Sequence, residues 1–133
     1  MGKDLNKNIK ARDEIIFGDF NPYVYLGGIR RFKGLTVDKL ELLIQANFVD
    51  VDTRQNYAPS IQELLDFAKI WGKDSYVFDG YTVIDTRPDY RVSIDGFSRI
   101  ASCFETDAEE RAFENLCREA DEFDLDTAKA WWD

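Results

Sequence analysis

Residues 47–56, NFVDVDTRQN, place Asp50 and Asp52 in a D-x-D pattern that is followed at once by Thr53. In some phosphotransferases a D-x-D-x-T at the end of a strand holds magnesium and supplies an aspartyl nucleophile. Here the threonine comes one residue early, and a helical pattern precedes the segment. A calcium loop is incomplete, because Gln55 stands where the tight turn needs glycine. The pattern is more typical of a connecting loop, and Asp50 and Asp52 stay as metal-site candidates.

A second group of chemically capable residues is the basic cluster GGIRRFKG, with Arg30, Arg31 and Lys33 around Phe32. Cationic groups this close together could contact a phosphate or an acidic partner. The glycine spacing matches neither of the glycine-rich nucleotide loops. The alternative interpretation is an edge strand whose charges discourage aggregation, with Arg30 and Phe32 on one face and Arg31 and Lys33 on the other.

The chain contains no histidine, which excludes Ser-His-Asp and Cys-His catalysis and any histidine-ligated metal. Acid–base chemistry would need a carboxylate, lysine, tyrosine or cysteine with a shifted pKa. Four aspartates lie at predicted sheet turns: Asp79, Asp85, Asp89 and Asp95. Consecutive hairpin turns alternate between the two ends of a meander, so these four carboxylates cannot all converge. We therefore predict no catalytic residue and no cofactor.

The C-terminal region is strongly acidic. Residues 105–133 hold eleven Asp and Glu against three Lys and Arg, within a chain whose net charge is −9. Such a surface favours basic partners and disfavours nucleic acid, because binding to nucleic acid depends on neutralising phosphates. The predicted partner contacts are Glu109, Glu110, Glu114, Glu119, Glu122 and Trp131.

Length and composition set the class of protein. The 133 residues, 44% of them hydrophobic, predict one folded domain, residues 1–133, without a membrane span. The opening residues lack the apolar run of a secretory signal, so a cytoplasmic location is expected. Two cysteines are expected to be reduced there.

Three segments carry apolar residues at helical spacing behind an N-cap residue. Two of them start with a capping box, in which a serine or threonine is followed three residues later by glutamate. Helices are therefore predicted over residues 35–48, 59–72 and 106–123, with N-caps at Thr36, Ser60 and Thr106.

Strands are indicated between these helices. Asp79-Gly80 is a type I′ turn dipeptide and predicts a hairpin that places Phe78 opposite Tyr81; Asp95-Gly96 repeats the signal. Further predictions are a meander over residues 74–104, one or two short strands over 15–32 with a bend at Gly27-Gly28, a loose or helical arm over 1–12, and a short turn or helix over 124–133. The order predicts an α+β fold, an antiparallel β-meander of three to five strands with helices packed mainly on one face.

Two adjacent tryptophans close the sequence, and on a helix their side chains diverge by about 100°. We predict that Trp132 anchors the end of the chain in the core and that Trp131 is partly exposed.

These features predict a non-catalytic acidic protein-binding module, in a narrower form an inhibitor or immunity-type protein that covers a basic partner. One alternative is a histidine-free enzyme that uses paired carboxylates or a divalent metal at Asp50 and Asp52. Another is a structural homo-oligomer.

Overall fold

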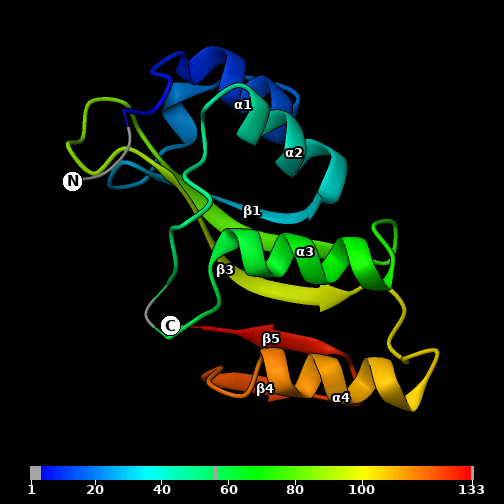
Figure 1. Cartoon of the computed structure of the whole chain (residues 1–133). Coiled ribbons are helices and arrows are strands. Elements are labelled where there is room, and N and C mark those ends of the chain that lie inside the picture. The colour runs from blue at the N-terminus through cyan, green and yellow to red at the C-terminus, as the bar shows by residue number, and fades with distance from the viewer. Residues whose placement is uncertain (1–3, 56, 133) are drawn as a thin grey trace.

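Five strands of the described chain, residues 4–55 and 57–132 of a computed structural model, form one antiparallel sheet in the order β1-β2-β3-β5-β4 (Figure 1). With four α-helices and one 3-10 helix they make an α+β fold, which confirms the predicted class. The strands are β1 (Ile29–Thr36), β2 (Tyr76–Val83), β3 (Val92–Arg99), β4 (Glu122–Asp124) and β5 (Lys129–Trp131). The helices are α1 (Ile9–Phe17), the 3-10 helix η1 (Pro22–Val24), α2 (Val37–Gln45), α3 (Ile61–Trp71) and α4 (Asp107–Leu116).

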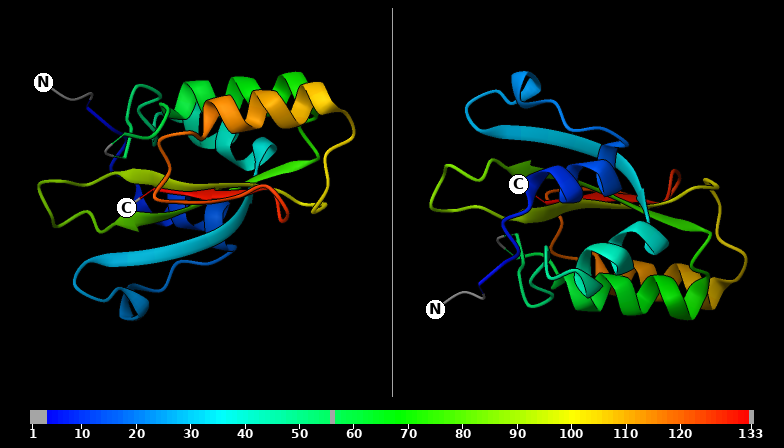
Figure 2. Two further views of the ribbon diagram at one scale, coloured as in Figure 1. Left: turned by 90° about the horizontal axis from the view of Figure 1, so that it is seen from below. Right: turned by 90° about the horizontal axis from the view of Figure 1, so that it is seen from above.

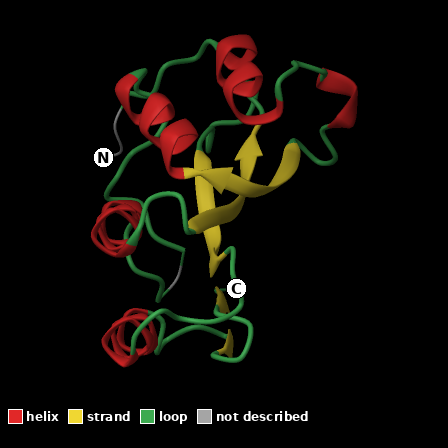
Figure 3. Ribbon diagram, turned by 90° about the vertical axis from the view of Figure 1, so that its right-hand side faces the viewer, coloured by secondary structure: helices red, strands yellow, loops and turns green. Residues whose placement is uncertain are grey.

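The helices α3 and α4 lie over the same face of the sheet (Figure 2). α1 and α2 lie at the β1 end (Figure 1). On the other side of β3, β5 and β4, Figure 3 shows no helix of the described chain. This half of the sheet is therefore open on one side. No described helix is long and apolar enough to cross a membrane.

Aromatic rings fill the space between the sheet and its two covering helices. Tyr76 of β2 stacks on Phe97 of β3 with 5.0 Å between ring centroids, and Phe97 lies 5.9 Å from Phe113 of α4. Phe67 of α3 packs edge-on against all three rings. All four are buried, so one aromatic cluster holds α3 and α4 to the sheet.

The helices α2 and α3 begin where the sequence predicts. Thr36 Oγ1 accepts the backbone N–H of Lys39 at 3.2 Å and starts α2. Ser60 and Glu63 exchange both hydrogen bonds of a capping box at the start of α3, which ends just before Gly72. These caps satisfy N–H groups that have no partner within the helix.

The two Asp-Gly dipeptides do not form turns, so the predicted hairpin within residues 74–104 is wrong at both positions. Asp79 and Gly80 lie inside β2, and Asp95 and Gly96 lie inside β3. A type I′ turn needs a positive φ at both central residues, and none of these four residues has one. The turn between the two strands lies instead at residues 84–91, which the sequence also marks as a turn.

β2 remains one continuous strand through Asp79-Gly80 because both of its edges are paired. β2 lies between β1 and β3, so a turn in its middle would break hydrogen bonds on both sides. Phe78, predicted to face Tyr81, instead pairs with Leu35 and Phe97 and is fully buried. A register shift beside this pair makes Asp95 the extra residue of a β-bulge.

The segment before β1 begins with a helix, although its β-branched residues predict strands over 15–32. Asn8 caps α1 by accepting the N–H of Ala11, and Ile16 lies buried in the last turn. Gly18 ends the helix with a left-handed φ of 81°. The predicted bend at Gly27-Gly28 is confirmed.

The predicted arm over residues 1–12 is packed against the body where the structure describes it, and residues 1–3 lie outside the described residues. The backbone N–H of Asn6 donates to the carbonyl of Asn47 at 2.8 Å, and its side chain donates to the carbonyl of Ala46 at 3.0 Å. α1 starts at Ile9. The arm therefore lies against the end of α2.

The C-terminal region departs from its predicted helices. α4 ends at Leu116, and residues 122–131 form a hairpin that pairs Glu122 with Trp131. Phe123, which fits the helical stripe by spacing, reaches the core from β4 and stacks 5.9 Å from Phe113. The hairpin extends the sheet past β3, so sheet pairing satisfies backbone groups that the sequence assigns to a helix.

The positions of the two tryptophans are confirmed, but the reason differs. Trp132 is 1% exposed, and its backbone N–H donates to the carbonyl of Asp95 at 2.8 Å. Trp131 is partly exposed. Extended backbone sends adjacent side chains to opposite faces, so the separation comes from strand alternation and not from helix rotation.

Candidate functional site

The outer face of α4 carries carboxylates that point to solvent. Glu110 and Glu114 are one helical turn apart on α4. Glu119 follows in the connection after α4, and Glu122 is the first residue of β4. All four side chains are exposed, and they form no ion pair within the described part of the chain. They therefore present their full negative charge to an approaching molecule.

Glu109 does not belong to this surface, which corrects its predicted role as a partner contact. It is 2% exposed and faces the sheet from the first turn of α4. Its carboxylate accepts the hydroxyl of Tyr76 at 2.6 Å, the Nε–H of Arg99 at 3.1 Å and the backbone N–H of Glu105 at 2.9 Å. Its own N–H donates to Thr106 Oγ1, the predicted N-cap. Glu109 thus joins α4 to β2 and β3.

The environment of this buried group sets its protonation. Burial by itself raises the pKa of Glu109, but the hydrogen bonds from Tyr76, the Glu105 backbone and Arg99 outweigh it and leave the pKa below its ordinary value. Burial and the hydrogen bond to Glu109 raise the pKa of the Tyr76 hydroxyl. Glu109 is therefore held as a carboxylate and Tyr76 as a neutral donor.

A groove lies next to the acidic surface on the open side of the sheet. It measures about 410 Å³ and is lined by Arg31 and Lys33 of β1, Asp79 of β2, Glu122 of β4 and Trp131 of β5. A second hollow of about 260 Å³ continues from the same aspartate, glutamate and tryptophan along the β4–β5 hairpin. The five lining residues, all of them singled out from the sequence alone, are thus brought together here from four strands.

The structure divides the predicted basic cluster between two faces of β1. Arg31 donates to both carboxylate oxygens of Asp95, at 3.1 and 2.9 Å, so its charge is balanced by a buried acid. Lys33 is exposed at the groove. Arg30 pairs with Asp19 at 3.2 Å and lies 3.6 Å from the ring centre of Phe17. The edge-strand position of β1 is confirmed, and the three cations do not converge on one anion.

The loop with Asp50 and Asp52 has the geometry of a turn. Asp50 Oδ1 accepts the backbone N–H of Asp52 at 3.1 Å, and its carbonyl accepts the N–H of Thr53 at 3.0 Å. Across the described residues, no three carboxylate or cysteine side chains come together as metal ligands would. The polar residues of this loop therefore organise its backbone.

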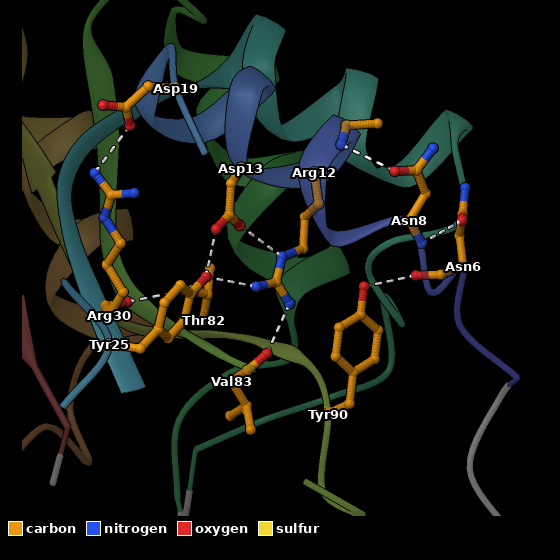
Figure 4. Close-up of polar contacts among 11 residues, drawn as sticks. Asn6, Asn8, Arg12, Asp13, Asp19, Tyr25, Arg30, Thr82, Val83 and Tyr90 are labelled. Carbon is orange, nitrogen blue, oxygen red and sulfur yellow. Dashed lines mark hydrogen bonds and ion pairs between the residues drawn. The ribbon is translucent and has the colours of Figure 1, made fainter. Parts of the chain in front are cut away.

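A fully buried charge cluster under α1 has no counterpart in the sequence predictions (Figure 4). Arg12 and Asp13 are both 0% exposed and form an ion pair at 3.0 Å. Arg12 also donates to the carbonyl of Val83 at 2.8 Å and to the hydroxyl of Tyr25 at 2.7 Å. That hydroxyl donates to Asp13 and lies 3.1 Å from Thr82 Oγ1.

This cluster links α1, the end of β2 and the loop before β1. The sequence gives no sign of it, because adjacent arginine and aspartate in a polar stretch normally lie at the surface. Arg12 and Asp13 come from α1, Tyr25 from the loop before β1, and Thr82 and Val83 from β2, so only the tertiary structure assembles the cluster.

No protein-family model, no curated protein and no solved structure matches this chain. Its geometry is therefore the only basis for proposing a function.

Proposed function

We propose that this protein is a non-catalytic module that binds a basic protein through the face formed by α4 and the β4–β5 hairpin. The observation that carries the proposal is the pairing of Glu122 with Trp131 in the hairpin. This pairing places the partly exposed indole beside the exposed Glu122 on the open side of the sheet. The exposed Glu110 and Glu114 lie on α4, which covers the other side of the same sheet edge (Figure 2). Tryptophan supplies contact area at interfaces, and the carboxylates steer a cationic surface toward it.

The properties of the buried groups support a binding role over a catalytic one. Burial raises the pKa values of the Tyr76 hydroxyl and the Cys117 thiol, so both are held in their protonated form. A nucleophile or general base needs the opposite shift. An acidic contact face also repels phosphates, so nucleic acid is not the proposed partner.

In the narrower form of the proposal, the protein covers a basic functional surface of its partner, as an inhibitor or immunity protein does. The net negative charge of α4 and β4 would speed association and would give it a strong dependence on salt. Both cysteines are free thiols, which fits a reducing compartment such as the cytoplasm.

The test compares three baits in pull-downs from a native lysate of the source organism. The first is the wild-type protein, and the second carries glutamine at the four exposed glutamates, Glu110→Gln, Glu114→Gln, Glu119→Gln and Glu122→Gln. The matched control removes the same charge from exposed carboxylates elsewhere, with Glu14→Gln, Asp52→Asn, Asp74→Asn and Asp85→Asn.

We expect the wild type and the control to capture the same basic protein at low salt and to release it at high salt. The two variants carry the same net charge, but only the α4–β4 variant has lost the four exposed glutamates of the contact face, so it should fail to capture the partner. Equal capture by both variants would contradict the proposal.

A further inference from the structure

The residues between α1 and β1 expose an unusual amount of apolar surface. Tyr23 is 92% exposed, Leu26 is 80% exposed and Val24 is 41% exposed. We call residues 22–26, which begin with η1, the apolar finger. Single exposed apolar side chains are common, but three within four residues are typical of an interaction surface.

The segment that contains the finger carries no charged side chain of its own. The ten residues 20–29, FNPYVYLGGI, contain no charged side chain, although 32% of the whole chain is charged. The finger therefore differs in chemistry from the acidic face of α4. A charged receptor would lose hydration on contact without gaining a partner, so the finger fits an uncharged receptor.

The finger is held in one shape by local hydrogen bonds. Asn21 Oδ1 accepts the N–H of Tyr23 at 3.0 Å and caps η1. Leu26 and Ile29 exchange backbone hydrogen bonds at 3.0 and 3.1 Å across Gly27-Gly28, whose φ angles are 61° and 82°. These values suit the tight turn that closes the finger.

The buried charge cluster provides the second anchor. Tyr25 is the one finger residue that turns inward, where its hydroxyl bonds to Arg12, Asp13 and Thr82 (Figure 4). Arg87 also donates to the carbonyl of Gly27 at 2.9 Å from the loop after β2. A rigid element loses little conformational entropy on binding, so this anchoring prepares the finger for contact.

The finger projects from the side of the sheet that lies opposite α3 and α4. Figure 2 and Figure 3 both show η1 protruding there, far from α4. A molecule that covers the acidic face therefore leaves the finger free. The two surfaces can be occupied at the same time by partners of different chemistry.

We propose that the apolar finger inserts Tyr23 and Leu26 into an uncharged, apolar pocket of a second protein. A convex finger needs a concave receptor, and three exposed side chains are far fewer than the roughly 20–30 residues per side of a stable flat interface. Two fingers of two copies would therefore make too small a contact, and two chains of charge −9 repel each other. The same charge disfavours an anionic lipid surface.

The test places a photocrosslinker, p-benzoylphenylalanine, at position 23 of the full chain and maps the adducts by mass spectrometry in a native lysate of the source organism. The control places it at position 57, because Tyr57 is 82% exposed on a different loop. The expected adduct joins position 23, and not position 57, to apolar residues of a different polypeptide. The adduct should persist at high salt and in the variant with the four α4–β4 glutamates neutralised. The crosslinking result is therefore independent of whether the proposed acidic contact exists.

Two substitutions, each combined with the crosslinker at position 23, test the chemistry of the contact. Leu26→Ser should lower the adduct yield about tenfold, because a buried leucine side chain is lost from the interface. Ile70→Ser, at a residue 75% exposed on α3, should leave the yield unchanged. Both positions are solvent-exposed, so thermal melts should show that both variants fold.

Three results would overturn the proposal. Equal labelling from positions 23 and 57 would show that the finger has no specific receptor. Adducts between two copies of the chain would identify a self-contact instead. Leu26-dependent sedimentation with phosphatidylcholine or mixed phosphatidylcholine–phosphatidylserine vesicles would identify a lipid surface.

Discussion

The first prediction concerns Glu109 and its neighbour Glu110, which are adjacent in sequence but opposite in environment. Glu109→Ala removes the acceptor of three hydrogen bonds and leaves two buried donors behind, Arg99 at 6% and Tyr76 at 1% exposure. Breaking a buried ion pair by removing one partner costs about 3–5 kcal/mol. Glu110→Ala removes a solvated carboxylate and should change stability by less than about 0.5 kcal/mol.

The assay is urea unfolding at neutral pH, followed by circular dichroism, on the wild type and both single variants. A loss of 3–5 kcal/mol is a large part of the total for a domain of this size, roughly 5–15 kcal/mol. The midpoint for Glu109→Ala should therefore fall far below that of the wild type. Equal midpoints for the two variants would refute the assignment of Glu109 to the interior.

The pH dependence provides an independent check with Glu109→Gln, which keeps the size and shape of the side chain. Because the pKa of Glu109 is lower in the folded state, its carboxylate contributes stability above its unfolded pKa of about 4.3. That contribution disappears as the pH falls through the folded value. The gap between wild type and variant should be constant near neutral pH and should narrow below about pH 4. A gap that does not change with pH would refute the ionised state.

Four further substitutions, at three places in the fold, test other parts of the structure. Gly80→Ala should strongly destabilise the protein in chemical unfolding, because its Cβ would lie 1.9 Å from the Ser93 carbonyl oxygen. Trp132→Phe should lower the free energy of unfolding by about 1–3 kcal/mol, because the core side chain becomes smaller. It should break no side-chain hydrogen bond, because the indole N–H has no partner in the described structure. Trp131→Phe should cost less stability and should remove part of the red-shifted, acrylamide-quenchable fluorescence, which the partly exposed Trp71 shares. Tyr25→Phe should cost about 1–3 kcal/mol, measured by thermal melting, because it removes the hydroxyl at the centre of the buried cluster.

The helices of the middle of the chain could be predicted because their signals are local. Thr36 and Ser60 act as N-caps through hydrogen bonds to residues three positions later, so neighbouring sequence is enough to identify them. The stripe of apolar residues then fixes which face of α3 meets the core. The candidate site was predicted in part for a similar reason, since charge density and a terminal tryptophan pair are visible in the sequence.

The predictions that are wrong or missing concern residues whose partners are distant in the sequence. A glutamate in a capping box can reach solvent or the core, and for Glu109 the choice depends on Tyr76 and Arg99, which lie on two other strands. The buried cluster around Arg12 likewise depends on Tyr25 and Thr82, which no local pattern connects to it.

The sequence by itself determines the α+β class, the starts of α2 and α3 and the acidic character of the C-terminal region, because each follows from composition or from contacts within a few residues. Only the tertiary structure decides the rest. Asp79-Gly80 has the local chemistry of a turn, yet pairing with strands on both sides keeps it extended. Residues 122–131 form a two-stranded hairpin because the edge of β3 offers β5 hydrogen bonds and Phe113 offers Phe123 a ring to pack against. Where a residue's partners are distant in sequence, their combined hydrogen bonding and burial outweigh its local preference.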